Sequence, residues 1–256
     1  MDAGIQVAEI PAGRGAGWLA ESWGIFRRRP IAWIGLCAGW LIVTFGLIIV
    51  PIVGGVVANF LQPVFFASFA FATLRQLRGE PLAMGDLFLG FRKNLRALVN
   101  LGAILLIVEI AIFALMAMLG LPVANTGDRN FTMAEYLAAL EGREWVLLLG
   151  FVLTVLVKGA LWFAPPLIAL RDMPMMHALR WSTYAALANV GAMIVYGLAL
   201  FTLFFAALIP WALGLIVVIP IMAISTYIGY RDVFEASAPS ASGDSSPPPS
   251  PGPSGR

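Results

Sequence analysis

The chain of 256 residues contains six long apolar segments, and these limit what it can fold into more than any other feature. A helix that crosses a bilayer needs about 20 mostly apolar residues. The segments are 31–50, 52–73, 98–121, 145–170, 190–209 and 211–230. Because lipid offers no hydrogen-bond partner to the backbone, such segments must satisfy their N–H and C=O groups internally as helices. The sequence therefore predicts an all-α polytopic membrane protein with six transmembrane helices.

The composition supports a membrane protein and excludes several other classes. Hydrophobic residues make up 60% of the chain and charged residues 12%, whereas soluble domains have about 45–50% and about 25%. Six such segments could not all be buried in a soluble protein with so little polar surface. The one cysteine and one histidine exclude a disulfide framework and a Cys/His zinc cluster. The net charge of +2 is too small for a nucleic-acid binder.

The connections between the segments predict three hairpins. Pro51 and Pro210 interrupt the first and third pairs, because proline cannot continue the hydrogen-bond ladder of a helix, so both connections should be tight. Amphipathic stretches with aromatic and basic residues precede the first, third and fifth segments, which is typical of helices in the headgroup layer. We interpret them as cytoplasmic elbow helices that anchor the hairpins, and a regulated lipid sensor is the alternative. Two sets of apolar residues have the spacing of one helix face, Leu19/Trp23/Phe26 and Phe88/Phe91/Leu95.

Basic residues predict the orientation in the membrane. Thirteen of the sixteen Lys and Arg residues lie on one side of the predicted segments, and only Arg129 and Arg143 lie on the other. The positive-inside rule therefore places both termini in the cytoplasm of a bacterial inner membrane. The first segment is too long and starts too late for a cleaved signal peptide, so we interpret it as an uncleaved span.

The chain divides into three parts. Residues 1–16 form an N-terminal cytoplasmic segment, residues 17–234 the six-helix transmembrane domain, and residues 235–256 a Pro/Ser-rich cytoplasmic tail. The tail has too few apolar residues to offset its ordering entropy, which predicts disorder. Its Pro248 and Pro251 also have the spacing of a P-x-x-P docking ligand, which is the alternative interpretation of the tail. Between the third and fourth segments, Thr132 and Glu135 have the spacing of a capping box and predict a short helix.

Three polar residues are predicted to meet inside the membrane. Glu109 lies thirteen residues after Arg96, Lys158 thirteen residues before Arg171, and Gln62 thirteen residues before Arg75. At about 1.5 Å per residue all three lie about 20 Å from the basic side. Because an unpaired charge there costs about 2.5–3.5 kcal/mol, we expect Glu109 and Lys158 to pair, with Gln62 adding hydrogen bonds.

The role of this cluster is open between two functions. It could be a static lock between helices, or a proton- or ion-responsive site in a transport path. A third possibility is that the side chains do not meet. The sequence predicts no catalytic residue, no cofactor and no metal ligand. Gly13–Gly17 has neither the lysine nor the spacing of a phosphate-binding loop and is interpreted as a flexible segment. Asp172 and Asp232 are expected to pair at the surface with the arginines before them.

Several short motifs resemble those of uncharacterised bacterial six-span inner-membrane proteins. They are Gly17, Trp18, Trp23, Phe26 and Pro30; Gly79, Pro81, Leu87 and Phe88; Ala164, Pro165, Ala178, Ser182 and Asn189; and Tyr227, Tyr230, Arg231, Asp232 and Phe234. The pattern of elbows and proline-bearing hairpins is also similar to the membrane domain fused to some glycerophosphodiester phosphodiesterases. The resemblance implies a six-helix fold in a bacterial inner membrane and no activity, since the phosphodiesterase catalytic domain has no counterpart here.

These observations favour a non-catalytic function. We expect a structural or accessory protein that interacts with lipids or other membrane proteins and binds no nucleic acid. The alternative is a small-solute or proton-coupled transporter that uses Gln62, Glu109 and Lys158. The sequence leaves the substrate and the oligomeric state open.

Overall fold

A computed structural model describes residues 5–121 and 132–235, and every regular element in those ranges is helical. Six helical segments are long and apolar enough to cross a membrane: α2, α3, α4, α6 with α7, α9 and α10. This confirms the predicted all-α fold with six membrane-spanning helices. The elements are α1 (Arg14–Phe26), α2 (Pro30–Ile48), α3 (Val53–Leu77), η1 (Met84–Arg92), α4 (Leu95–Met118), α5 (Met133–Leu140), α6 (Glu144–Ala160), α7 (Ala164–Leu170), α8 (Met175–Ala188), α9 (Val190–Leu208) and α10 (Leu215–Phe234).

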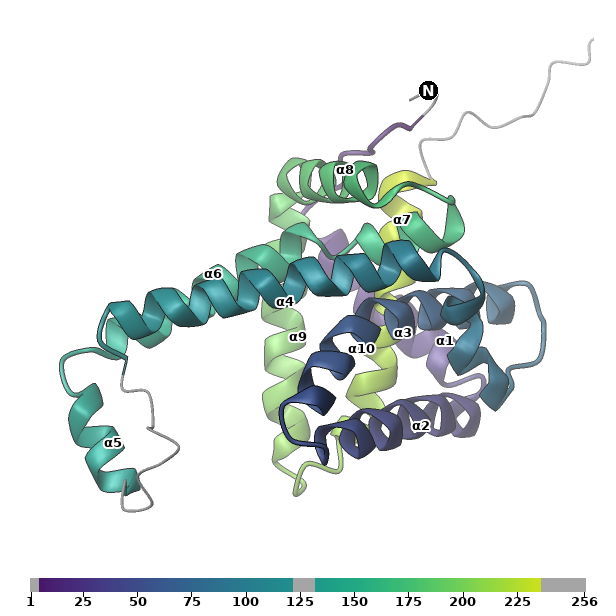
Figure 1. Ribbon diagram of the computed structural model, residues 1–256. Coiled ribbons are helices and arrows are strands. Elements are labelled where there is room, and N and C mark those ends of the chain that lie inside the picture. The colour runs from purple at the N-terminus through teal and green to yellow at the C-terminus, as the bar shows by residue number, and fades with distance from the viewer. Residues whose placement is uncertain (1–4, 122–131, 236–256) are drawn as a thin grey trace, which may run out of the picture.

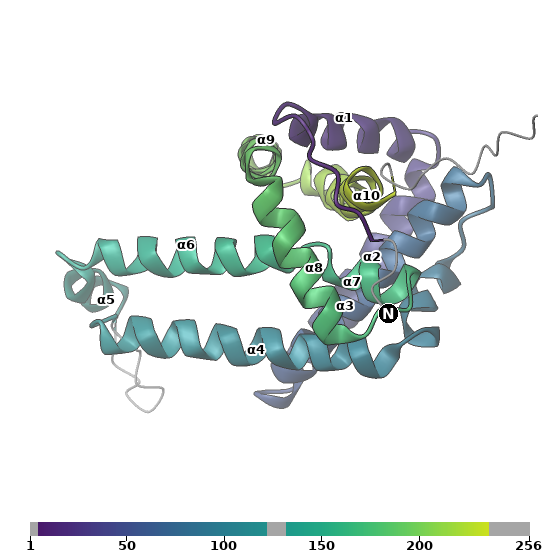
Figure 2. The same cartoon turned by 90° about the horizontal axis from the view of Figure 1, so that it is seen from above.

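The membrane helices form three hairpins, α2–α3, α4–α6/α7 and α9–α10, as predicted (Figure 1). We call the end where α2, α4 and α9 begin the base, and the connections within the hairpins the tips. The α4–α6 hairpin runs away from the other helices, with α5 at its far end (Figure 2). We refer to α4 and α6 together as the arm.

Helix α10 lies at the centre of the molecule. In its membrane window 72% of residues are buried, against 17% for α2, α4, α6/α7 and α9. Small residues in α10 allow this packing. Gly229 is one of them, since a Cβ atom there would just touch the rings of Trp18 in α1 and Phe163 before α7. The core therefore gathers around α10, and the other helices leave much of their apolar surface outside.

The fourth membrane segment is not the continuous helix that we predicted, because it breaks between Ala160 and Ala164. Pro165 and Pro166 occupy the first turn of α7, where the missing N–H groups have no intrahelical partner to lose. The hydroxyl of Ser182 in α8 bridges the break. Its Oγ donates to the Ala160 carbonyl (2.7 Å) and accepts from the Phe163 N–H (3.1 Å).

The two proline turns differ in length. The first is tight as predicted, with α2 ending at Ile48 and α3 beginning at Val53. The prediction for the third hairpin was wrong, because α10 begins at Leu215 rather than at residue 211. Trp211 and Ala212 adopt positive φ angles of 54° and 63°, so the chain makes an irregular turn before the helix resumes.

The elbows exist, but only the first of the two predicted faces lies on one helix. In α1, Leu19 and Phe26 of that face are buried and Trp23 is 47% exposed. The second elbow, η1, is a 3-10 helix. The face Phe88/Phe91/Leu95 therefore does not exist as one helical stripe, since η1 ends before residue 95. The third elbow is the α-helix α8.

The start of the chain is ordered where we expected flexibility. Helix α1 begins at Arg14, and Gly15 lies so close to α9 that a Cβ atom there would come within 2.0 Å of the Ala192 carbonyl oxygen. The absence of a side chain at Gly15 thus allows α1 to pack closely against α9. The predicted capping box at Thr132 and Glu135 is confirmed at the start of α5. The predicted tail, with Pro248 and Pro251, lies outside the described residues apart from Glu235.

Candidate functional site

The three polar residues singled out in the sequence lie together where α3, α4 and α6 meet. The Lys158 Nζ atom is 2.5 Å from the Glu109 Oε1 atom and 3.5 Å from the Gln62 Oε1 atom, to which it donates. We call these three residues the polar triad. Equal spacing from Arg75 and Arg96 along the continuous helices α3 and α4 accounts for the shared level of Gln62 and Glu109. For Lys158 the break between Ala160 and Ala164 interrupts the count from Arg171, and its contacts place it with the other two.

The polar triad is partly open. The Lys158 and Glu109 side chains are 36% and 31% exposed, so the pair borders the outside of the helix bundle. Trp162 follows four residues after Lys158, and its Nε1 atom is buried without a hydrogen-bond partner among the described residues. The ring of Trp162 lies 5.5 Å from that of Tyr196 and 6.3 Å from that of Phe66. Aromatic rings therefore lie on the base side of the pair.

Two further polar residues on the same helices do not join the triad. Asn59 donates to the Gly55 carbonyl of its own helix (3.3 Å), and Thr154 donates to the Gly150 carbonyl (2.9 Å). A single acid–base pair with one amide can fix three helices to one another, or it can hold and release one proton. The pair is thus compatible with both a lock and a proton-responsive site.

A second polar group joins α1 to the base end of α10. The Arg14 Nε atom is 2.6 Å from Asp232, Arg14 also contacts Glu21 (2.8 Å), and Arg231 contacts Glu21 (2.8 Å) and Asp232 (2.9 Å). The Trp18 ring nitrogen donates to Asp232 (3.2 Å). Burial raises the pKa of the Glu21 carboxyl, but hydrogen bonds from Arg231 and Arg14 outweigh burial and hold that pKa below its usual value.

Further hydrogen bonds tie α7 to its neighbours at the base. Arg171 donates to the Tyr230 hydroxyl (3.0 Å) and to the Phe234 carbonyl (2.6 Å), which satisfies the last turn of α10. Asn94 donates to the Ile168 carbonyl (3.0 Å) and to Asp172 (2.9 Å). The expected pairing of each aspartate with the arginine before it is therefore wrong for Asp172 and incomplete for Asp232.

Polar side chains near the end of α3 add further contacts at the base. The Gln76 side chain donates to the Ile25 carbonyl at the end of α1 (2.8 Å) and accepts from the Trp33 ring nitrogen (2.6 Å). Arg75 pairs with the buried Asp86 of η1. The links α3–α1–α10–α7–α4 thus form one continuous chain of polar contacts, which we call the base belt.

The base belt accounts for several of the motif residues on which the sequence resemblance rests. Trp18, Tyr230 and Asp232 bond within the belt, and Ser182 bridges the break in the fourth segment. These motif residues therefore hold the helices together. The belt could not be found from spacing, because its partners lie as far as 218 positions apart in the chain.

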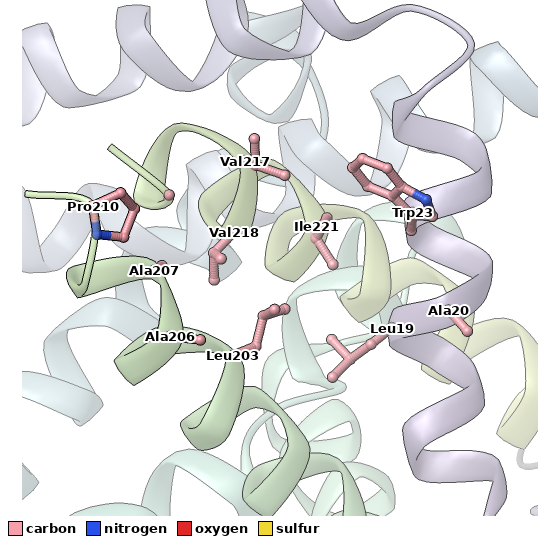
Figure 3. Close-up of a pocket in the computed structure, with 11 residues that line it drawn as sticks. Leu19, Ala20, Trp23, Leu203, Ala206, Ala207, Pro210, Val217, Val218 and Ile221 are labelled. Carbon is pink, nitrogen blue, oxygen red and sulfur yellow. The ribbon is translucent and has the colours of Figure 1, made fainter. Parts of the chain in front are cut away.

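The structure also contains an apolar groove between α1, α9 and α10, with a volume of about 510 Å³ (Figure 3). Trp23 and Leu19 of α1 form one wall, and Pro210 lies at the opposite end. No group of three or more His, Cys, Asp or Glu residues that could hold a metal ion occurs within residues 5–121 and 132–235. Cys37 is buried in α2 as a packing residue.

The comparisons with known proteins indicate a membrane location, as the six apolar helices do. The chain is similar to a probable inner membrane protein of Burkholderia thailandensis, with 29% identity over 93% of this chain and 97% of that protein. No family model matches the chain, and no solved structure matches it either. The likeness to the membrane domain of glycerophosphodiester phosphodiesterases therefore rests on the residue pattern alone. The similarity and the six apolar helices agree on an integral protein of the bacterial inner membrane.

Proposed function

We propose that the protein is a non-catalytic accessory protein of the inner membrane, which acts through contacts with lipids or other membrane proteins. The observation that carries this proposal is the arm. Its two helices pack on each other and, toward their base ends, on α3 and α8, but their far halves run away from the other membrane helices (Figure 1, Figure 2). An exposed apolar patch of this size marks an interaction surface.

The arm exposes large apolar side chains on both of its helices. Thirteen of them are at least 39% exposed: Leu95, Ile107, Ile110, Phe113, Leu115 and Met118 in α4, and Trp145, Leu147, Leu148, Phe151, Val152, Val155 and Leu156 in α6. A small cluster of Leu121, Leu140 and Val146 closes the far end of the arm. In a bilayer this surface is covered by acyl chains or by helices of another protein.

We further propose that both termini are cytoplasmic and that the base faces the inner leaflet. The basic residues of the segments at the base support this orientation under the positive-inside rule. A fluorescent protein fused after residue 256 should therefore fluoresce, and alkaline phosphatase at the same position should be inactive. Phosphatase fused after Glu141 in a truncated chain should be active. The reverse pattern would contradict the proposed orientation.

The partial exposure of Glu109 and Lys158 favours a second candidate, a transporter that uses the polar triad. The two functions differ in the medium that surrounds the exposed side of the Glu109–Lys158 pair. In an accessory protein it faces acyl chains, whereas in a transporter it faces water.

Labelling with a membrane-impermeant maleimide separates the two. The chain has one cysteine, so Cys37→Ala gives a cysteine-free background. In that background Glu109→Cys and Lys158→Cys should remain unlabelled in intact membranes, like the apolar control Phe151→Cys. Glu141→Cys, at the exposed end of α5, should be labelled from outside. Labelling at 109 and 158 above the level of position 151 would favour the transporter and contradict the accessory role.

A further inference from the structure

A second cavity of about 590 Å³ lies at the base, between α8 and the N-terminal segment that precedes α1. We call residues 5–10 of that segment the strap. The volume falls within the range of about 300–1,000 Å³ that is usual for small-ligand sites. Seven residues line the cavity: Ile5, Gln6, Val7, His177, Arg180, Trp181 and Tyr184.

The strap is fixed in place by hydrogen bonds to distant parts of the chain. Ala8 N–H donates to the Val233 carbonyl at the end of α10 (2.8 Å). The buried Asn189, at the junction of α8 and α9, accepts from Ile10 N–H (2.8 Å) and donates to the Ala8 carbonyl (3.0 Å). The strap is therefore a built wall of the cavity, and Asn189 holds it against the end of α8.

The opposite wall carries a cation that no residue in the described ranges neutralises. Arg180 is exposed and makes no ion pair or hydrogen bond with any residue in the described ranges. This contrasts with Arg14, Arg75, Arg171 and Arg231, each of which is bonded within the base belt. Arginine offers a planar fork of donors that matches the oxygens of a phosphate. His177 adds a second nitrogen-bearing side chain to the same wall.

The rest of the lining suits the border between headgroups and acyl chains. The Trp181 and Tyr184 rings meet edge to face, with centroids 6.0 Å apart, and Tyr184 is 56% exposed. Tryptophan and tyrosine are enriched at this depth of a membrane because their rings are apolar and their tips polar. Ile5 and Val7 supply apolar surface from the strap.

We propose that this cavity binds the phosphate of an anionic phospholipid, with Arg180 as the phosphate ligand and Trp181 and Tyr184 against the glycerol and the first acyl carbons. The inference rests on the proposed lipid-contacting function and names the lipid class. Basic pockets on the cytoplasmic side of membrane proteins bind anionic headgroups in this way. The apolar groove in Figure 3 shows no such chemistry, because nearly all of its lining is aliphatic.

Native mass spectrometry of the detergent-purified full chain tests the proposal. Phosphatidylglycerol should bind at lower concentration than phosphatidylcholine, and Arg180→Gln should weaken phosphatidylglycerol binding about tenfold, because it removes a charge-assisted hydrogen bond. Arg92→Gln is the matched control, since it removes one exposed positive charge from η1 at the base but does not line the cavity. It should leave the affinity within twofold of the wild type. Asn189→Ala, which frees the strap, should also weaken binding while Arg180 is intact.

Three results would overturn the proposal. One is equal affinity for phosphatidylglycerol and phosphatidylcholine, and another is equal weakening by the Arg180 and Arg92 variants. The third is full competition by glycerol phosphate at the same concentration as the lipid, which would identify a site for a soluble phosphate. None of these results bears on the maleimide labelling at 109 and 158, so failure of this proposal is distinguishable from failure of the proposed function.

Discussion

Lys158→Met should lower the stability of the detergent-solubilised protein by about 2–3 kcal/mol, because it leaves Glu109 without its partner in an apolar layer. For a chain of this size the melting temperature should fall by about 5–10 °C. Glu109→Gln should have a similar effect, since Lys158 then loses its counter-charge and keeps only neutral amide acceptors. The measurement is thermal unfolding of the purified variants, together with their abundance in membranes.

The double change Glu109→Gln with Lys158→Met decides whether the loss comes from an unpaired charge. With both charges gone no charge remains to be desolvated, so the double variant should be more stable than either single variant. Lys93→Met is the control, because Lys93 and Asp172 form an exposed pair at 3.6 Å whose loss should be nearly neutral. If the single and double variants all keep the abundance and melting temperature of the wild type, the pair does not stabilise the bundle.

Gly102→Ala should destabilise the protein by about 1–3 kcal/mol, the usual cost of overpacking. Helices α3 and α4 approach so closely that a Cβ atom at position 102 would lie 2.6 Å from both the Cα atom and the carbonyl oxygen of Phe60. Backbone atoms cannot move aside as a flexible side chain can, so the helices must separate. Because Gln62 and Glu109 lie on these two helices, their separation should also loosen the polar triad.

Gly55→Ala and Gly197→Ala are matched controls for this substitution. Both glycines lie in membrane helices, and a Cβ atom at either position would meet nothing within 4 Å. These variants should melt at or slightly above the wild-type temperature, because alanine has about 1 kcal/mol better helix propensity than glycine. Equal melting temperatures for all three alanine variants would show that the close approach at Gly102 does not limit stability.

The number and approximate positions of the membrane helices were predictable from the sequence, because they follow from the preference of apolar side chains for lipid over water. A bilayer imposes a minimum apolar length, so the six helices could be read from hydropathy alone. What could not be read was how tertiary contacts reshape the ends of segments. The hydroxyl of Ser182 stabilises a break that hydropathy does not register, and the turn after Pro210 uses positive φ angles at Trp211 and Ala212. Neither feature leaves a periodic signal.

The candidate sites also divide into contacts that sequence spacing predicts and contacts that depend on how the helices dock. Counting along the continuous helices α3 and α4 puts Gln62 and Glu109 at one depth, because the rise per residue of a helix is constant. The count to Lys158 crosses the break between Ala160 and Ala164, although Lys158 does contact both residues. The partners of Asp232 and Arg171 depend on how α1 and α7 dock against α10, which no local spacing encodes. The strap was missed for the same reason. Its glycine-rich continuation suggested flexibility, whereas Asn189 holds it from the far half of the chain.

The hydrogen bonds and ion pairs that hold the strap and α1 also determine how late in synthesis these two segments can reach their final positions. Arg14 can bond to Asp232 only after 218 further residues have been synthesised. Ile10 can bond to Asn189 only after 179 further residues. At about 5–20 residues per second the first of these intervals lasts about 10–45 s. The earliest segment to be synthesised is thus among the last to find its place, and the nascent N-terminus needs protection until the final helix has inserted.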